Sequence, residues 1–366
     1  MAVRWSDERA AIDIEILTLL EHNQYGRVVA LADSAIGAGH GDPRILGQKA
    51  QALGSLGRYD ESIAVFEKAI IGDYQNCENH LNFAVMLMRA GKTGRAITEF
   101  MVAKRFCPPN RLPLINRNLA VANIKLGESD QAMQYVRDGL RIDPLDPYLR
   151  GLEGMLVADS DPARAESLFV RLRQAGDVDP EFLYQFGLLL LRTERSGEAV
   201  EVLSAASKRR PGDSAIQINL AEALSRARRD DEAETVLRSL LDSEVGRDAT
   251  RKLARLLFRQ GRYAEALEYY RALPPTPESM DRIAMCLHGL GKLDEAIEWA
   301  RRALEARPEW PAAMVNMAVI LAASGELDEA ESLLIRVLEL EPDNMTARIN
   351  LDRLRRARAN EPSRHR

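Results

Sequence analysis

The amino-acid sequence predicts an all-α solenoid, in which short helical hairpins stack one after another along the chain. Three observations lead to this prediction: apolar residues recur with the spacing of an amphipathic helix, glycines and prolines recur where helices should end, and the whole pattern returns about every 34 residues. Hairpins of this kind bury their apolar faces against their neighbours, so the length of the chain does not require several separate domains.

The segment 311–342 shows the repeating unit most clearly. Its first half places apolar residues at the i, i+3, i+4, i+7 positions of one helical face, namely Met314, Met317, Ala318 and Leu321. We expect Gly325 to end this helix, Asp328 to cap a second one and Pro342 to stop it. The segment therefore predicts two helices joined by a tight turn.

Counting in both directions from this segment gives ten units, which start at residues 9, 43, 77, 113, 146, 180, 214, 247, 277 and 311. The eighth place of the unit is small in eight of them, as close helix crossing requires: Ala50, Ala84, Ala120, Gly187, Ala221, Ala254, Ala284 and Ala318. The twentieth place, on the partner helix, is also small: Ser62, Ala96, Ala132, Ala165, Ala199, Ala233, Ala266, Ala296 and Ala330.

These repeats resemble the tetratricopeptide repeat (TPR) family, and the resemblance covers nearly the whole chain. It implies a right-handed superhelical solenoid of antiparallel helix pairs, with a concave face lined by the first helix of each pair. The expected organisation is a lead-in at 1–8, ten repeats at 9–344, a capping helix at 345–359 and a disordered basic tail at 360–366.

Two places break the period. The third unit is two residues longer than the others around it, and the eighth is short and ends in Leu-Pro-Pro-Thr-Pro. Because the curvature of a solenoid depends on uniform stacking, we predict altered curvature at residues 108–112 and 274–277.

Composition narrows the function classes. The net charge of −5 argues against a general nucleic-acid binder, although seven arginines and two acidic residues follow from Met345 onward. The charged start of the chain lacks the features of a secretory signal, and no stretch is apolar enough to span a membrane. Three cysteines predict no disulfide framework and a reducing, cytoplasmic location.

No catalytic constellation or cofactor motif is present, so we expect a protein that is not an enzyme and needs no cofactor. Ala-Gly-Lys-Thr-Gly at 90–94 lacks the earlier glycine of a phosphate-binding loop and falls on a turn between helices. Cys77, His80 and Cys107 lie at one end of the same predicted hairpin and offer three soft ligands to zinc, but no fourth is evident. The alternative, and the favoured one, is ordinary buried thiols beside a histidine.

A row of amides occupies the sixth place of the first helix, which is expected to face the groove: Gln48, Asn82, Asn118, Gln185, Asn219 and Asn316, with Asn350 in the capping helix. Amides in such a row can pair with the backbone of an extended peptide. The row resembles the asparagine ladder of the TPR domain of O-linked N-acetylglucosamine transferase. The alternative role is to position the helices themselves.

Cations interrupt this row near the eighth unit: Arg226, Arg251, Lys252, Arg255, Arg259 and Arg282. Crowded cations repel one another unless an anionic partner or neighbouring acids compensate, so they predict a docking site for an acidic segment or a terminal carboxylate. The alternative is a solvated face paired with Glu222, Glu278 or Asp281. An apolar set, Tyr184 and Leu188 with Val157 and Leu191, is a second candidate contact surface.

These patterns predict a scaffold or adaptor that holds a segment of another protein in its groove. The alternative is a regulatory or substrate-recruiting subunit whose catalytic domain lies on another chain. Nucleic-acid binding is less favoured, because the arginine cluster and the basic tail are far apart in the array. Self-association through the end repeats is a further option.

Overall fold

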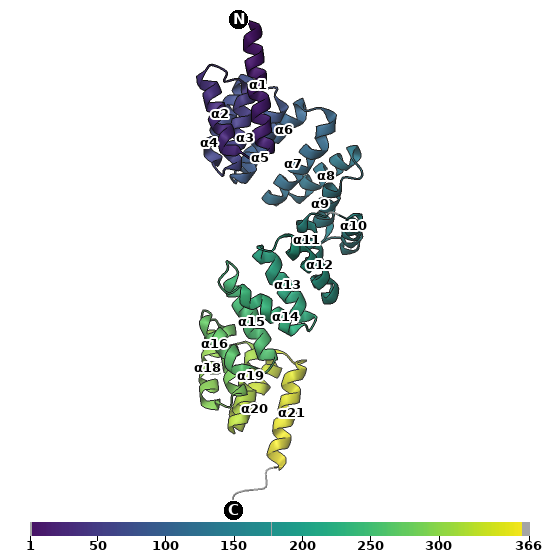
Figure 1. Ribbon diagram of the computed structural model, residues 1–366. Helices are drawn as coiled ribbons and strands as arrows, with labels where there is room; N and C mark the ends of the chain where they lie inside the picture. Colours follow the sequence, from purple (N-terminus) through teal and green to yellow (C-terminus); the bar gives the residue numbers. More distant parts are fainter. Residues whose placement is uncertain (1, 177, 361–366) are drawn as a thin grey trace, which may run out of the picture. The chain divides into compact units, whose positions relative to one another are not determined.

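The computed structural model describes residues 2–176 and 178–360, and in this part of the chain all regular structure is helical (Figure 1). The helices follow one another as hairpins, which confirms the predicted solenoid of helix pairs. No described helix is both long and apolar enough to cross a membrane. Contacts divide the chain into two compact units, Met1–Phe182 and Leu183–Arg366, and each is described by itself.

The first unit contains five hairpins. Their helices are α1 (Ala2–Glu21) with α2 (Tyr25–Gly37), α3 (Pro43–Ser55) with α4 (Tyr59–Gly72), α5 (Cys77–Arg89) with α6 (Thr93–Phe106), α7 (Leu112–Leu126) with α8 (Ser129–Ile142), and α9 (Pro147–Val157) with α10 (Pro162–Ala175). The segment expected as a lead-in forms the start of α1. The two extra residues of the third unit are taken up by the 3-10 helix η1 (Pro109–Arg111); the altered curvature there stays a prediction.

The helix α11 (Pro180–Arg192) begins in the first unit and continues into the second. The second unit then contains α12 (Ser196–Arg209), α13 (Ser214–Arg226) with α14 (Asp230–Ser239), α15 (Gly246–Arg259) with α16 (Tyr263–Ala272), α17 (Pro277–Gly289) with α18 (Leu293–Ala306), α19 (Pro311–Ser324) with α20 (Leu327–Leu340), and α21 (Met345–Asn360). The predicted capping helix thus corresponds to α21, while the tail at 361–366 lies outside the described residues.

The turn inside most hairpins contains one residue with a left-handed backbone, usually a glycine. Gly325, as expected, takes this conformation with φ 93° and ends α19. The prediction that Asp328 caps α20 was wrong: α20 begins at Leu327, and Glu326 occupies the capping position without a side-chain bond. The backbone closes the turn alone, because the N–H of Glu326 donates to Leu321 O (2.9 Å) and that of Leu327 to Gly325 O (2.9 Å).

Close approach of the two helices holds each hairpin together, as the small residues at places eight and twenty predict. Ala84 of α5 and Ala96 of α6 are both fully buried in the core of the third hairpin. In the second hairpin, the Ser62 hydroxyl donates to the backbone oxygen of Ala50 at 2.6 Å. Only small side chains fit at such a crossing, so these residues fix the distance between the helices.

A larger residue at this crossing should therefore be destabilising. We expect Ala84→Leu to lower the free energy of unfolding by about 1–3 kcal/mol, because the added atoms force neighbouring side chains out of their preferred rotamers. Urea denaturation measures the change. Ala64→Leu, on the exposed side of α4, is the matched control and should leave the midpoint nearly unchanged; equal loss in both variants would contradict the packing argument.

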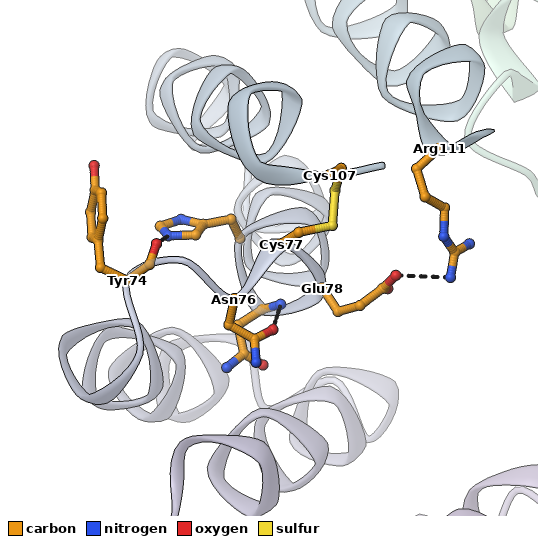
Figure 2. Close-up of a disulfide and its surroundings, with 8 residues drawn as sticks. Tyr74, Asn76, Cys77, Glu78, Cys107 and Arg111 are labelled. Carbon is orange, nitrogen blue, oxygen red and sulfur yellow. Dashed lines mark hydrogen bonds and ion pairs between the residues drawn. A yellow bond between two sulfur atoms is a disulfide. The ribbon is translucent and has the colours of Figure 1, made fainter. Parts of the chain in front are cut away.

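A disulfide joins Cys77, the first residue of α5, to Cys107, directly after α6 (Figure 2). The residues that follow Cys77 contact both neighbouring hairpins. Glu78 forms an ion pair with Arg111 of η1 at 2.8 Å, and the Asn79 amide donates to Pro43 O at 3.1 Å. The bond therefore closes the third hairpin at the point where it meets the hairpins before and after it.

This bond corrects two expectations from the sequence. The prediction that the cysteines form no disulfide was wrong for Cys77 and Cys107, because the first and last turns of one hairpin lie side by side. It also removes the zinc candidate, since the two sulfur atoms bind each other. His80 is fully buried and occupied on both ring nitrogens, by Glu99 Oε2 at 2.6 Å and Tyr74 O at 2.9 Å. Among the described residues, no metal-binding cluster is found.

Reduction of the disulfide should lower stability. The bond closes a loop with a sequence separation of 30, for which loss of the crosslink costs about 2–4 kcal/mol. We expect a lower melting temperature in dithiothreitol, measured by circular dichroism. The Cys77→Ser/Cys107→Ser variant should melt at the temperature of the reduced wild type and should not respond to dithiothreitol. A wild-type melting curve that reductant leaves unchanged would contradict the role of the bond.

Candidate functional site

The main cavity described in the second unit, about 600 Å³, lies between α15 and α17 and is closed on one side by the end of α16. Both walls contribute basic side chains, and the closed side contributes apolar ones. The lining residues are Arg247, Asp248, Arg251, Lys252 and Arg255 from α15, Tyr270, Leu273, Pro274 and Thr276 from the end of α16 and the link after it, and Glu278, Ser279 and Arg282 from α17.

The cavity lies beside the end of a short second helix, α16. This helix has 10 residues, as α14 does, whereas α18 and α20 have 14 each. In a full-length hairpin the last turn of the second helix packs against the first turns of the helices beside it: a methyl group added to Gly72 of α4 would lie 2.7 Å from Pro43, and one on Gly139 of α8 would lie 2.5 Å from Leu149. α16 ends at Ala272, four residues shorter than α18 and α20, and Leu273 and Pro274 directly after it line the cavity.

Three of the predicted cations converge on one buried carboxylate, that of Glu222 in α13. Lys252 Nζ lies 2.8 Å from it, Arg226 Nε 2.7 Å and Arg255 Nη2 3.2 Å. Burial by itself would raise the pKa of Glu222, but the hydrogen bonds from Lys252 and Arg226 and the nearby charge of Arg255 outweigh it and lower the pKa to about 2. Glu222 therefore stays ionised and links the seventh and eighth hairpins.

The other carboxylates expected as partners bind elsewhere. Glu278 pairs with Arg307 at 2.6 Å, and the buried Asp281 accepts two hydrogen bonds from the Asn316 amide, at 2.9 and 3.1 Å. Burial raises the pKa of Asp281, despite the opposing effects of Asn316 and Arg282. Arg259 pairs with Asp230 at 2.6 Å, so it is also engaged within the chain.

The remaining cations of the cavity have little compensation. In the described part of the chain, the ion pair of Arg251 is with the half-exposed Asp248, at 3.3 Å. Arg247 and Arg282 line the cavity from opposite helices, and within the part of the chain that the structure describes neither has a hydrogen bond or ion pair. Their guanidinium groups are available to a ligand.

The amide row of the second unit makes bonds within the protein. Asn219 donates to the Tyr184 hydroxyl at 3.1 Å and to Ala215 O at 2.8 Å, and Asn316 donates to Asp281. The bond from Asn219 to Tyr184 joins α13 to α11, and the bond from Asn316 to Asp281 joins α19 to α17. Each bond thus connects the first helices of two successive hairpins. These two amides thus have the geometry of the helix-positioning role that the sequence left open.

In the first unit the row is less engaged. Gln48 is buried and its amide oxygen meets no partner among the described atoms. Asn82 and Asn118 are half-buried, and no hydrogen bond of either amide is found in the described part of the chain. Gln185, near the boundary of the two units, is half-buried.

The apolar candidate set is divided by burial. Leu191 is buried, whereas Leu188 and Tyr184 are half-buried, and the Tyr184 hydroxyl is bound to Asn219. Val157, half-buried, belongs to the other unit. Within the second unit, Leu188 and Tyr184 are accordingly the two members of this set with partly accessible surface.

The free cysteine of the described chain, Cys286 of α17, is buried and is not among the residues that line the cavity. Burial raises the pKa of its thiol to about 12, although Arg282 acts in the opposite direction. A thiol of this kind is protonated at neutral pH and is a poor nucleophile. The charge and the shape of the cavity are therefore what it offers to a ligand.

Sequence reasoning missed Arg247 and the apolar wall. One signal was present in the sequence. Arg247 stands at the first place of its unit, and proline occupies this place in five other units: Pro43, Pro113, Pro180, Pro277 and Pro311. An arginine there replaces an apolar packing residue with a long cation. The apolar wall of Leu273 and Pro274 depends on the short α16 and has no local pattern of its own.

The Glu222 network should contribute to stability in a pH-dependent way. The folded-state pKa of Glu222 is about 2, below its unfolded value, so the contribution is present above about pH 4.5 and is lost as the pH falls toward 2. We expect Glu222→Gln to lower the free energy of unfolding by about 1–3 kcal/mol at pH 7, with a smaller difference from wild type below pH 3. Glu232→Gln, which removes an exposed glutamate, is the control.

Urea denaturation of the wild type and both variants at several pH values measures this contribution. A pH-independent difference for Glu222→Gln would contradict the assigned ion pairs.

Comparisons with known proteins agree with the fold. Family models described as tetratricopeptide repeat match residues 43–70, 118–144, 156–214, 190–249, 248–273 and 287–358. None of the curated proteins matches the sequence.

Similar solved structures include PilF of Pseudomonas aeruginosa, at 17% identity over 58% of this chain and 98% of that one, with a TM-score of 0.47. Tom70 of yeast is 16% identical over 97% of this chain and 89% of that one (TM-score 0.41). MamA of Desulfovibrio magneticus is 18% identical over 46% and 98% (TM-score 0.43).

The repeat length, the small residues at the helix crossings and the hairpins themselves agree with these matches along the chain. The chain belongs to the tetratricopeptide repeat family.

Proposed function

We propose that this protein is a non-catalytic scaffold that binds a negatively charged segment of a partner protein in the cavity between α15 and α17. The observation that carries the proposal is the set of arginines on both walls of that cavity, two of which have no ion-pair partner in the described part of the chain. Cations held close together without counter-charges are stabilised by an anionic ligand.

The rest of the cavity suits a peptide better than a bare ion. Its volume, about 600 Å³, falls within the range of small-molecule and peptide side-chain sites. Leu273, Pro274 and the ring of the buried Tyr270 provide apolar contact beside the charges. Tetratricopeptide repeats are typical protein-interaction scaffolds, so an acidic segment or a chain-terminal carboxylate of another protein is the ligand class that fits.

The disulfide of the third hairpin supports a proposal about the compartment in which the protein acts. Structural disulfides persist in oxidising compartments and are rare in the cytosol. The bond between Cys77 and Cys107 therefore favours an oxidising compartment over the cytoplasmic location that the cysteine count predicted. Alkylation of thiols in intact cells of the native host, followed by mass spectrometry, tests this: protection of both cysteines supports it, and free thiols support the cytoplasm.

Binding of labelled peptide pools tests the proposed function. We expect a pool rich in Asp and Glu to bind the full-length protein, measured by fluorescence anisotropy, and a Lys-rich pool of equal length not to bind. Raising the salt from about 50 to about 500 mM should weaken the complex, since screening acts on exposed charges.

Arg251→Glu/Arg282→Glu should abolish binding of the acidic pool, because it reverses one charge on each wall of the cavity. Arg356→Glu, which reverses the charge of an exposed arginine of α21, is the control. Acidic peptides that bind the cavity variant and the wild type equally would exclude this docking site.

A further inference from the structure

We infer that the cavity recognises two negative charges held close together on the partner segment, and that Arg247 and Arg282 are the residues that bind them. A phosphorylated side chain or two adjacent carboxylates provide this chemistry. The inference rests on the proposed function and deepens it, because it names the charge of the ligand and separates the binding cations from the structural ones.

Two cations of the cavity are already engaged within the protein. Lys252 and Arg255 both bind Glu222, at 2.8 and 3.2 Å, and the carboxylate of Glu222 is almost fully buried. Withdrawing either cation toward a ligand would leave that buried charge less well compensated, which is costly. Lys252 and Arg255 therefore act as positioning residues that join α13 to α15.

Two other cations of the cavity, Arg247 and Arg282, have no such partner in the described part of the chain. Arg247, in the first turn of α15, and Arg282, in the second turn of α17, are both exposed and line the same cavity. In the described part of the chain, neither forms a hydrogen bond or an ion pair. The two guanidinium groups thus approach one space from opposite walls, with no carboxylate assigned to either.

The acids at the rim do not change this balance. Glu278 is engaged by Arg307 at 2.6 Å, and Asp281 is buried against the Asn316 amide. Asp248 is offset by Arg251 at 3.3 Å, an exposed pair that contributes little stability and can open for a ligand. Arg282 also acts on the charge of its neighbour Asp281, without an ion pair to it. Neither Arg247 nor Arg282 has an ion-pair partner in the described part of the chain, and a ligand with two negative charges supplies one to each.

Arginine also favours this kind of ligand by its shape. The planar guanidinium group donates two parallel N–H bonds to the oxygens of a phosphoryl or carboxylate group. A phosphoryl group carries between one and a half and two negative charges near neutral pH and offers three acceptor oxygens. Such a group would lie between the first two turns of α15 and of α17, where Arg247 and Arg282 line the cavity.

Three peptide pools with the same randomised flanking residues test the inference. Their central position carries serine, phosphoserine or an Asp-Asp pair, and each pool is titrated into the full-length protein by fluorescence anisotropy. We expect the doubly charged pools to bind at least about tenfold more tightly than the serine pool. A gain for phosphoserine alone identifies a phosphorylated ligand, and a gain for both identifies any compact pair of charges.

Variants separate the two groups of cations. Arg247→Gln/Arg282→Gln should lose the gain in affinity while the melting temperature stays at the wild-type value. Arg356→Gln, at an exposed arginine of α21, is the matched control and should keep the gain. Lys252→Gln should lower the melting temperature, because it removes a cation from Glu222.

The outcomes distinguish this inference from the proposed function. Equal affinity for the serine and doubly charged pools, or a gain that survives loss of Arg247 and Arg282, would overturn the inference. If a general acidic pool still bound the cavity in that case, the proposed function would stand. Absence of binding by every acidic pool would overturn both.

Discussion

The structure depends on the close contact between the two helices of each hairpin. Fully buried alanines such as Ala84 and Ala96 allow the two backbones to approach, and in the second hairpin Ser62 adds a hydrogen bond to Ala50 across the same contact. A hairpin with this fixed spacing presents one continuous apolar face, which it can bury only against its neighbours. The regular stacking within each unit follows from a contact that involves very small side chains.

Most of the fold could be predicted from the sequence because the determinants of a hairpin are local. The crossing residues and Gly325 act within about 34 residues of one another, and their periodicity is visible without a structure. Asp328 shows the limit of local reasoning: the residue type was right for a cap, but backbone bonds around Gly325 and Leu327 closed the turn first. Cys77 and Cys107 were expected near each other, yet proximity alone did not distinguish a disulfide from a metal site.

The candidate site was only partly predictable. Arginine and lysine in α15 were visible as a cluster, but which of them are neutralised depends on Glu222, which lies on a different hairpin. The same holds for the amides: for Asn316 the sequence left ligand contact and helix positioning open, and in the structure its partner is Asp281 of α17. Interactions between repeats decide these roles, and they depend on geometry that a single repeat does not contain. Arg247 was not predicted because it stands at the first place of its repeat, whereas the groove-facing pattern was sought at the sixth place.

The short α16 shows that a repeat protein can vary the length of one helix while it keeps the crossing contact of the hairpin. Each hairpin contacts chiefly its neighbours, so removing one turn from a second helix leaves the crossing residue Ala266 and the packing of adjacent hairpins in place. The length of a second helix can therefore vary without disturbing the contact that holds its hairpin together, and the surface between the flanking first helices can vary with it.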